Sequence, residues 1–182
     1  MSNQTIPASE VQATASLPAD ENSELNNQLL TFRLEHQLYG VSICHVEQII
    51  SMQPVTEVPE YPSYAKGIVS LRGTIIPIID LRLRLGRTET VYTERTCIVI
   101  INIGELQLGC IVDEVDAVVH ISEDQIEPAP RMSETSAANR YLTGIARIPG
   151  ENDGAKEKIV LCLDLTKILQ KDEFEALAGA AV

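Results

Sequence analysis

LLTFRLEHQLYGVSICHVEQII, residues 29–50, returns in outline as IVIINIGELQLGCIVDEVDAVV, residues 98–119. When the second stretch is placed over the first, residue for residue, their apolar positions coincide. Each stretch has two short β-type runs on either side of a polar pair, which predicts one hairpin at Glu35-His36 and another at Gly104-Glu105. A pattern that recurs in this way indicates that one supersecondary unit is present twice.

The motifs that follow each stretch repeat in the same order. Tyr64-x-x-Gly67-Ile68 is matched by Tyr141-x-x-Gly144-Ile145, and IIPIIDL at 75–81 is matched by IVLCLDL at 159–165. Three matched blocks in one order indicate an internal duplication, with repeat units at about 29–86 and 97–170. Strands this short predict a pair of small antiparallel β-barrels that share an apolar seam.

The composition restricts both the core and the partners. The chain is 45% apolar but only 4% aromatic, so the core must consist of Ile, Val and Leu, which suits strands. The formal net charge of −12 argues against binding to nucleic acid or to an anionic membrane surface. No apolar run is long enough to span a bilayer, and the N-terminus lacks the pattern of a secretory signal, so we expect a cytoplasmic protein. The four cysteines are expected to be buried, reduced thiols: Cys44, Cys97, Cys110 and Cys162.

The ends and connections differ from the repeats in composition. Residues 1–27 are mainly small and polar, with acids but no base, and are predicted to form a flexible acidic tail. The folded domain is expected over 28–178, with 179–182 as a short C-terminal tail. The stretch 87–95 is a polar connection between the repeats, and 149–157 is an insertion that predicts a solvated loop in the second repeat.

No combination of side chains predicts catalysis. Asp80 and Asp164 close the two repeats, and a symmetric carboxylate pair can be catalytic. Each one, however, stands just before an amphipathic stretch, where a helix N-cap explains it fully. The acids Asp113, Glu114 and Asp116 lack the spacing of a calcium loop and indicate a solvated bend. We therefore expect no enzyme activity, no cofactor and no metal.

Arg72 is the basic residue that stands out. It is expected at a turn between two strongly apolar strands, and the second repeat has Pro149 at the matching position. The duplicated fold therefore does not require an arginine there, and arginine is enriched among the residues that anchor protein partners. Pro77 in the strand that follows predicts an edge or a bulge.

At these residues the chain resembles the family of CheW-like chemotaxis coupling proteins. The resemblance covers about residues 28–178. It rests on GIVSLRGTIIPIIDLR at 67–82, QLYGVSI at 37–43, LGCIVDEV at 108–115, IEPAP at 126–130 and YLTG at 141–144.

The resemblance implies an all-β fold with short helices, made of two intertwined five-stranded SH3-like or OB-like β-barrel subdomains. It also implies a non-enzymatic adaptor, cytoplasmic and recruited to membrane receptor arrays. Its partners would be the regulatory domain of a CheA-type histidine kinase and the cytoplasmic tip of methyl-accepting chemoreceptors.

By the same resemblance, receptors would bind in a groove between the subdomains that contains Val46, Gln48, Gly67, Ser70, Arg72, Gly73 and Val118. Gln48 stands where the family often has an acid, and Ser70 where it often has Asn, which bears on the choice of receptor. The kinase-facing residues stay unassigned.

Two other functions are compatible with the sequence. The same adaptor role could serve a pilus-motility or other non-flagellar chemosensory pathway. An OB-like ligand-binding module is disfavoured, because two Phe and a charge of −12 leave little for stacking or for a basic groove.

Overall fold

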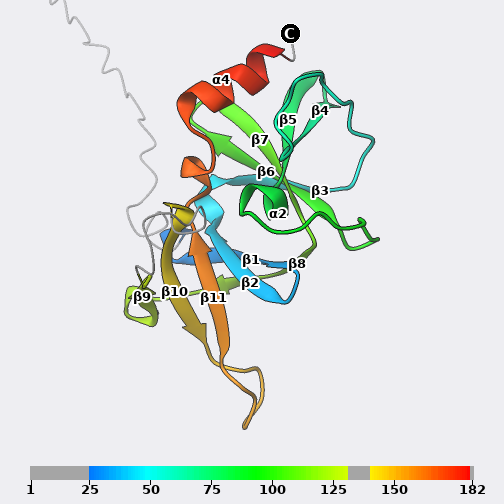
Figure 1. Cartoon of the computed structure of the whole chain (residues 1–182). Helices are drawn as coiled ribbons and strands as arrows, with labels where there is room; N and C mark the ends of the chain where they lie inside the picture. Colours follow the sequence, from blue (N-terminus) through cyan, green and yellow to red (C-terminus); the bar gives the residue numbers. More distant parts are fainter. Residues whose placement is uncertain (1–24, 131–139, 181–182) are drawn as a thin grey trace, which may run out of the picture.

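The computed structural model of the chain describes residues 25–130 and 140–180 (Figure 1). Both repeats contain the same elements in the same order. Each begins with a hairpin: β1 Gln28–Leu34 with β2 Gln37–Ser42, and β6 Cys97–Ile103 with β7 Leu106–Val112. Each continues with a strand that crosses to the other sheet: β3 Val46–Ser51 and β8 Glu114–His120. A second pair of strands follows: β4 Ala65–Leu71 with β5 Thr74–Asp80, and β10 Leu142–Ile148 with β11 Lys158–Leu163.

Short helical elements complete the two repeats. Helix α2 Leu81–Arg84 follows β5, and the 3₁₀ turn η3 Leu165–Lys167 follows β11 at the matching place. The remaining short elements are η1 Ile43–His45, η2 Glu123–Gln125 and β9 Ile126–Pro128. Helix α4 Lys171–Ala180 is an addition after the second repeat. The order of elements confirms the predicted duplication.

Each sheet contains strands from both repeats. One sheet has the order β8-β1-β2-β11-β10-β9 and the other β3-β6-β7-β5-β4 (Figure 1). The first hairpin of each repeat is therefore extended by the later strands of the other repeat, which confirms two intertwined β subdomains. We name them the six-stranded and the five-stranded subdomain.

The expectation of purely antiparallel barrels is wrong. Strand β2 pairs with β11, and β5 with β7, in parallel. These are two of the strand pairs that join one repeat to the other; the pairs β1–β8 and β3–β6 also join the repeats but are antiparallel. Strands from different repeats are not joined by a tight turn, so their pairing can be of either direction.

The two subdomains close at their ends in related ways. Thr56 and Ile68 form a two-way backbone bridge, with both N···O distances 2.9 Å, which joins the chain after β3 to β4. In the other subdomain this place is occupied by β9, which pairs with β10. That sheet consequently has one strand more than the predicted five. A glycine permits the close approach in both cases, Gly67 beside Thr56 and Gly144 beside Glu127.

Three apolar clusters form the core. The largest lies between the subdomains and includes Phe32 from one sheet and Ile101 from the other. A cluster with Leu29, Val160 and Cys162 fills the six-stranded subdomain, and an isoleucine-rich cluster fills the five-stranded one.

The cysteines are free throughout the described residues, but they are not all buried. Cys110 and Cys162 are buried, Cys97 is half-buried and Cys44 is exposed. Burial of Cys44 was expected because it sits inside an apolar, strand-like run of the sequence. It is exposed because residues 43–45 form η1, which takes the chain from one sheet to the other.

The predicted acidic tail over residues 1–27 lies, except for 25–27, outside the described residues. Residues 181–182 of the predicted C-terminal tail also lie outside them.

Candidate functional site

The residues assigned to receptor binding lie on three strands and one turn. Val46 and Gln48 are on β3, Gly67 and Ser70 on β4, Arg72 and Gly73 in the β4–β5 turn, and Val118 on β8. Strands β3 and β4 are the two edges of the five-stranded sheet, whereas β8 is an edge of the other sheet. In the described parts of the chain, no side-chain hydrogen bond or ion pair joins one of these residues to another. The groove itself stays a prediction.

The β4–β5 turn holds Arg72 in an unusual backbone conformation. Its φ is 52° and that of Gly73 is 82°, which are the two positive values of a type I′ hairpin turn. Asn, Asp or Gly normally takes the first of these positions, because a longer side chain is strained there. Arg72 is exposed. A strained position that carries an exposed guanidinium is typical of a residue retained for binding.

Large apolar side chains are exposed at matching positions of the two repeats. Ile49 on β3 and Val118 on β8 are equivalent and are 43% and 52% exposed. Ile75 on β5 and Ile159 on β11 are also equivalent and are 49% and 52% exposed. Each subdomain thus exposes large apolar side chains at equivalent positions of the two repeats.

Charged side chains fix the subdomains to each other where the chain crosses after β7. Arg82 Nε donates to Asp113 Oδ1 at 2.7 Å, and a second guanidinium N–H reaches Oδ2. The Glu35 backbone N–H also donates to Asp113 Oδ2, at 2.7 Å. The hydrogen bond with Asp113 is the main reason that the pKa of Arg82 is raised.

Arg87 extends this contact to β2, because it donates to the Glu35 carboxylate and to the Tyr39 hydroxyl, both at 2.7 Å. The predicted bend at Asp113 is present, but it is not solvated, because Asp113 is half-buried and accepts from Arg82 and Glu35. Its partners lie far along the chain, in the β1–β2 turn and in α2.

A second arginine holds α4 in place. The Arg84 guanidinium carbon lies 4.4 Å from the Tyr64 ring centroid and 5.7 Å from that of Tyr141, which are equivalent residues of the two repeats. Arg84 also donates to the Glu173 carboxylate at 2.7 Å. Burial alone would raise the pKa of Glu173, but the Gln170 N–H and Arg84 together lower it. Helix α4 is thus anchored at the seam of the duplication.

The two aspartates that end the repeats cap helical turns. Asp80 Oδ1 accepts from the N–H groups of Arg82 at 2.9 Å and Leu83 at 3.4 Å. Asp164 Oδ1 accepts from Thr166 N at 3.0 Å. Asp80 Oδ2 has a further donor, the Tyr92 hydroxyl at 2.8 Å. Burial and the neighbouring Asp80 raise the pKa of Tyr92, so the phenol stays protonated and donates.

Over residues 25–130 and 140–180, no three His, Cys, Asp or Glu side chains gather as metal ligands would. Across the same ranges, the helices are all too short or too polar to cross a membrane.

Comparison with known proteins gives a consistent result. Residues 28–173 match the CheW-like domain family. The chain is 32% identical to the chemotaxis protein CheW of Klebsiella aerogenes, over 93% of this chain and 96% of that one. It is 33% identical to the protein of that name from Treponema pallidum, over 84% and 87%. The crystal structure of the scaffolding protein TtCheW from Thermoanaerobacter tengcongensis matches with a TM-score of 0.69 and 30% identity, over 81% of this chain and 95% of that one.

Proposed function

This chain belongs to the CheW-like family, whose members are adaptors and scaffolds of chemotaxis, and we propose that it couples methyl-accepting chemoreceptors to a CheA-type histidine kinase. It does so in the cytoplasm, recruited to membrane receptor arrays, and without catalysis. Such a role needs separate surfaces for two partners. The rigid junction of the two subdomains keeps those surfaces at a constant distance.

The observation that carries the receptor half of the proposal is the Arg72 turn. A receptor tip is a helical hairpin, and an amphipathic helix binds by laying its apolar face in a groove. Val46 and Val118 offer apolar contacts, while Arg72 offers a charged anchor of the kind found at binding hot spots. An arginine is present at Arg72 although Asn, Asp or Gly would make the turn more stable, which supports a binding role for its guanidinium.

The kinase half is supported by the duplicated apolar positions. The regulatory domain of the kinase is expected to share this fold, so it would also present two similar subdomains. Ile75 and Ile159 lie at the start of matching strands and are both exposed. We assign the kinase contacts to Ile159, which lies in the other subdomain from the Arg72 turn, since Ile75 pairs directly with the receptor residue Ser70.

Calorimetric titration tests the two halves separately. The wild-type chain is expected to bind the isolated regulatory domain of its own organism's kinase saturably and 1:1. Arg72→Ala should leave that binding unchanged and weaken the binding of a receptor signalling fragment by about 1–3 kcal/mol, the usual hot-spot range. Ile159→Asp should do the reverse.

Arg147→Ala is the matched control, because Arg147 is an exposed arginine on β10 of the other subdomain, at the position equivalent to Ser70. It should alter neither binding. Unchanged receptor affinity in Arg72→Ala would remove the receptor assignment, and failure to bind the kinase domain would remove the adaptor role. Repeating the titration with kinases from flagellar and pilus-motility pathways identifies the pathway.

A further inference from the structure

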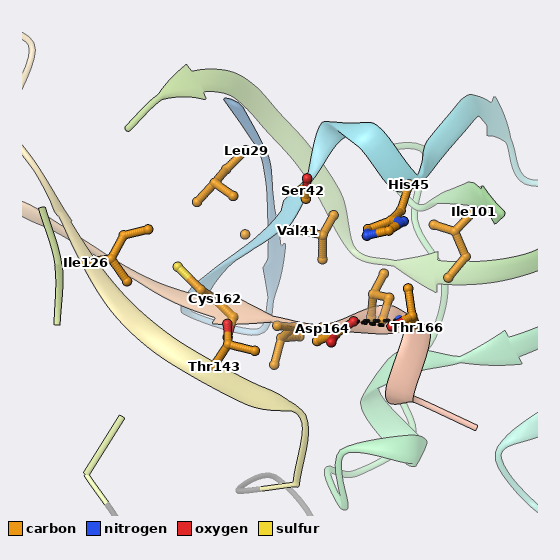
Figure 2. A pocket seen from close by; sticks show the side chains of 13 residues that line it. Leu29, Val41, Ser42, His45, Ile101, Ile126, Thr143, Cys162, Asp164 and Thr166 are labelled. Atoms are coloured by element: carbon orange, nitrogen blue, oxygen red, sulfur yellow. Dashed lines mark hydrogen bonds between the residues drawn. The ribbon is translucent and has the colours of Figure 1, made fainter. Parts of the chain in front are cut away.

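An open pocket of ≈ 250 Å³ lies in the six-stranded subdomain and is bordered by His45 of η1 and by Ile101 of the other subdomain (Figure 2). Its apolar wall includes Leu29, Val41 and Cys162, and its polar side includes Ser42 and Asp164. The Cys162 thiol adds no charge, because burial raises its pKa to about 11. None of the residues assigned to receptor binding lines this pocket.

The repeat alignment explains why the pocket exists. Cys162 stands at the position of Ile78 in the other subdomain, and Ser42 at the position of Ile111. Both isoleucines are buried in the core of the five-stranded subdomain. Smaller side chains on the same backbone therefore leave space in the six-stranded subdomain.

A tyrosine occupies the equivalent place in the five-stranded subdomain. Tyr92 comes from the connection between the repeats and packs against the isoleucine cluster. Its hydroxyl donates to Asp80 Oδ2 at 2.8 Å, and Asp80 is the counterpart of Asp164. After the second repeat the chain instead enters α4, where Phe174 is buried in the cluster between the subdomains.

Asp164 consequently keeps an acceptor free of any hydrogen bond from the described residues. Thr166 satisfies Oδ1, through its N–H at 3.0 Å and its hydroxyl at 2.5 Å. The group near Oδ2 is the Lys167 ammonium at 3.7 Å, which is exposed. A carboxylate oxygen beside an apolar wall is suited to a ligand that joins a ring to a hydroxyl donor.

We propose that this pocket binds a phenol ring whose hydroxyl donates to Asp164 Oδ2, as Tyr92 donates to Asp80. The ring rests against Leu29 and Cys162. An apolar cavity smaller than this one can hold a benzene-sized ring, so the volume suffices. The carboxylate selects a neutral donor over a carboxylate ligand. The site goes beyond the adaptor role, because it lies apart from the residues proposed for either partner.

A ligand series on the wild-type protein tests the hydrogen bond. In a two-dimensional NMR titration, p-cresol should shift the amides of Gly40, Thr143 and Cys162. Toluene and 4-methylanisole have the same ring but no hydroxyl donor. They should bind about tenfold more weakly or worse, because a hydrogen bond to a charged group is lost. N-acetyltyrosine amide distinguishes the two sources of a phenol ring. If it binds, the natural ligand is a tyrosine side chain of a partner protein. If only p-cresol binds, the natural ligand is a free phenol.

Variants locate the site. The double variant Cys162→Ile with Ser42→Ile introduces the isoleucines of the five-stranded subdomain and should abolish p-cresol binding. Asp164→Asn can still cap the helical turn, and it should remove the preference for p-cresol over toluene. Arg147→Ala, on the neighbouring strand β10 but exposed, should bind p-cresol normally. Thermal melting confirms that each variant folds. Equal affinity for toluene and p-cresol, or unchanged binding in the filled variant, would overturn the proposal. Kinase titration of the same proteins reports separately on the adaptor role.

Discussion

The two subdomains have the same strand arrangement but different interiors. The five-stranded one is filled by isoleucines and by Tyr92, whereas the six-stranded one has smaller side chains and an open pocket. The connections differ as well, since Arg72-Gly73 is a tight turn and 149–157 is a long loop. The two repeats thus keep the glycines and helix-capping residues that their common backbone requires, whereas the sizes of their interior side chains differ.

The two closure glycines give the largest difference between the halves. A Cβ on Gly67 would lie 2.0 Å from the Thr56 carbonyl oxygen, at a φ of +141°. Gly67→Ala should therefore destabilise the protein by about 3–5 kcal/mol. A Cβ on Gly144 would lie 2.9 Å from Glu127 O and 2.7 Å from a methyl group of Ile126, so Gly144→Ala should cost only about 1–3 kcal/mol. Urea denaturation measures both, and equal costs would show that the two closures are mechanically alike.

Removing the ring that fills the five-stranded subdomain should make the two interiors alike. Tyr92→Ala is expected to lower the free energy of unfolding by about 2–4 kcal/mol, since a half-buried ring is lost and Asp80 loses a donor. Tyr92→Phe isolates the hydroxyl and should cost about 1–2 kcal/mol. Partial restoration of the melting temperature of Tyr92→Ala by p-cresol would demonstrate the equivalence directly. A melting curve like that of the wild type would mean that the ring is not a core residue.

The crossings between sheets also differ, because Asp113 occupies one and Cys44 the matching position of the other. Asp113→Ala should cost about 2 kcal/mol, because it leaves Arg82 and the Glu35 N–H without their acceptor. Cys44 is exposed, so Cys44→Ala should change stability by less than about 0.5 kcal/mol. Chemical denaturation of the two variants under one condition makes the comparison, and similar values would mean that the ion pairs do not fix the junction.

The smallest effect concerns α4, which is present only after the second repeat. The pKa of Glu173 is lower in the folded protein than its ordinary value of about 4.3. Its contribution to stability is therefore complete at neutral pH and is lost as the pH falls below the ordinary value and through the lower pKa of the folded protein. Melting temperatures at pH 7 and pH 3.5 should differ less in Glu173→Gln than in the wild type. If the two proteins show the same difference in melting temperature, the acid sensitivity comes from groups other than Glu173.

The features predicted from the sequence are those that neighbouring residues determine. The hairpins at Glu35-His36 and Gly104-Glu105 follow from alternation and turn chemistry, and the order of the repeats follows from matched blocks. The parallel pairs were missed because a periodic strand pattern does not specify which distant strand lies beside it. The resemblance, and not the pattern, implied the intertwining.

The site features that were missed depend on partners in space. The bend at Asp113 was predicted but its ion pair was missed, because Arg82 comes near Asp113 only after the sheets exchange strands. The pocket was not foreseen because Cys162, the counterpart of Ile78, looks like an ordinary core residue in the sequence. Only the structure shows that the second repeat has no ring where Tyr92 packs in the five-stranded subdomain. The positive φ of Arg72 was not foreseen either, although the flanking strands located its turn correctly.

The exchange of strands has a consequence for biosynthesis. Strand β2 obtains its second neighbour only when β11 has been translated, and β1 must wait for β8. The first repeat cannot complete a sheet while it emerges from the ribosome, and both edges of its hairpin remain open until the second repeat follows. Folding is therefore a late event that requires nearly the whole chain, and two fragments divided within residues 87–96 should each be unstructured and become folded on mixing.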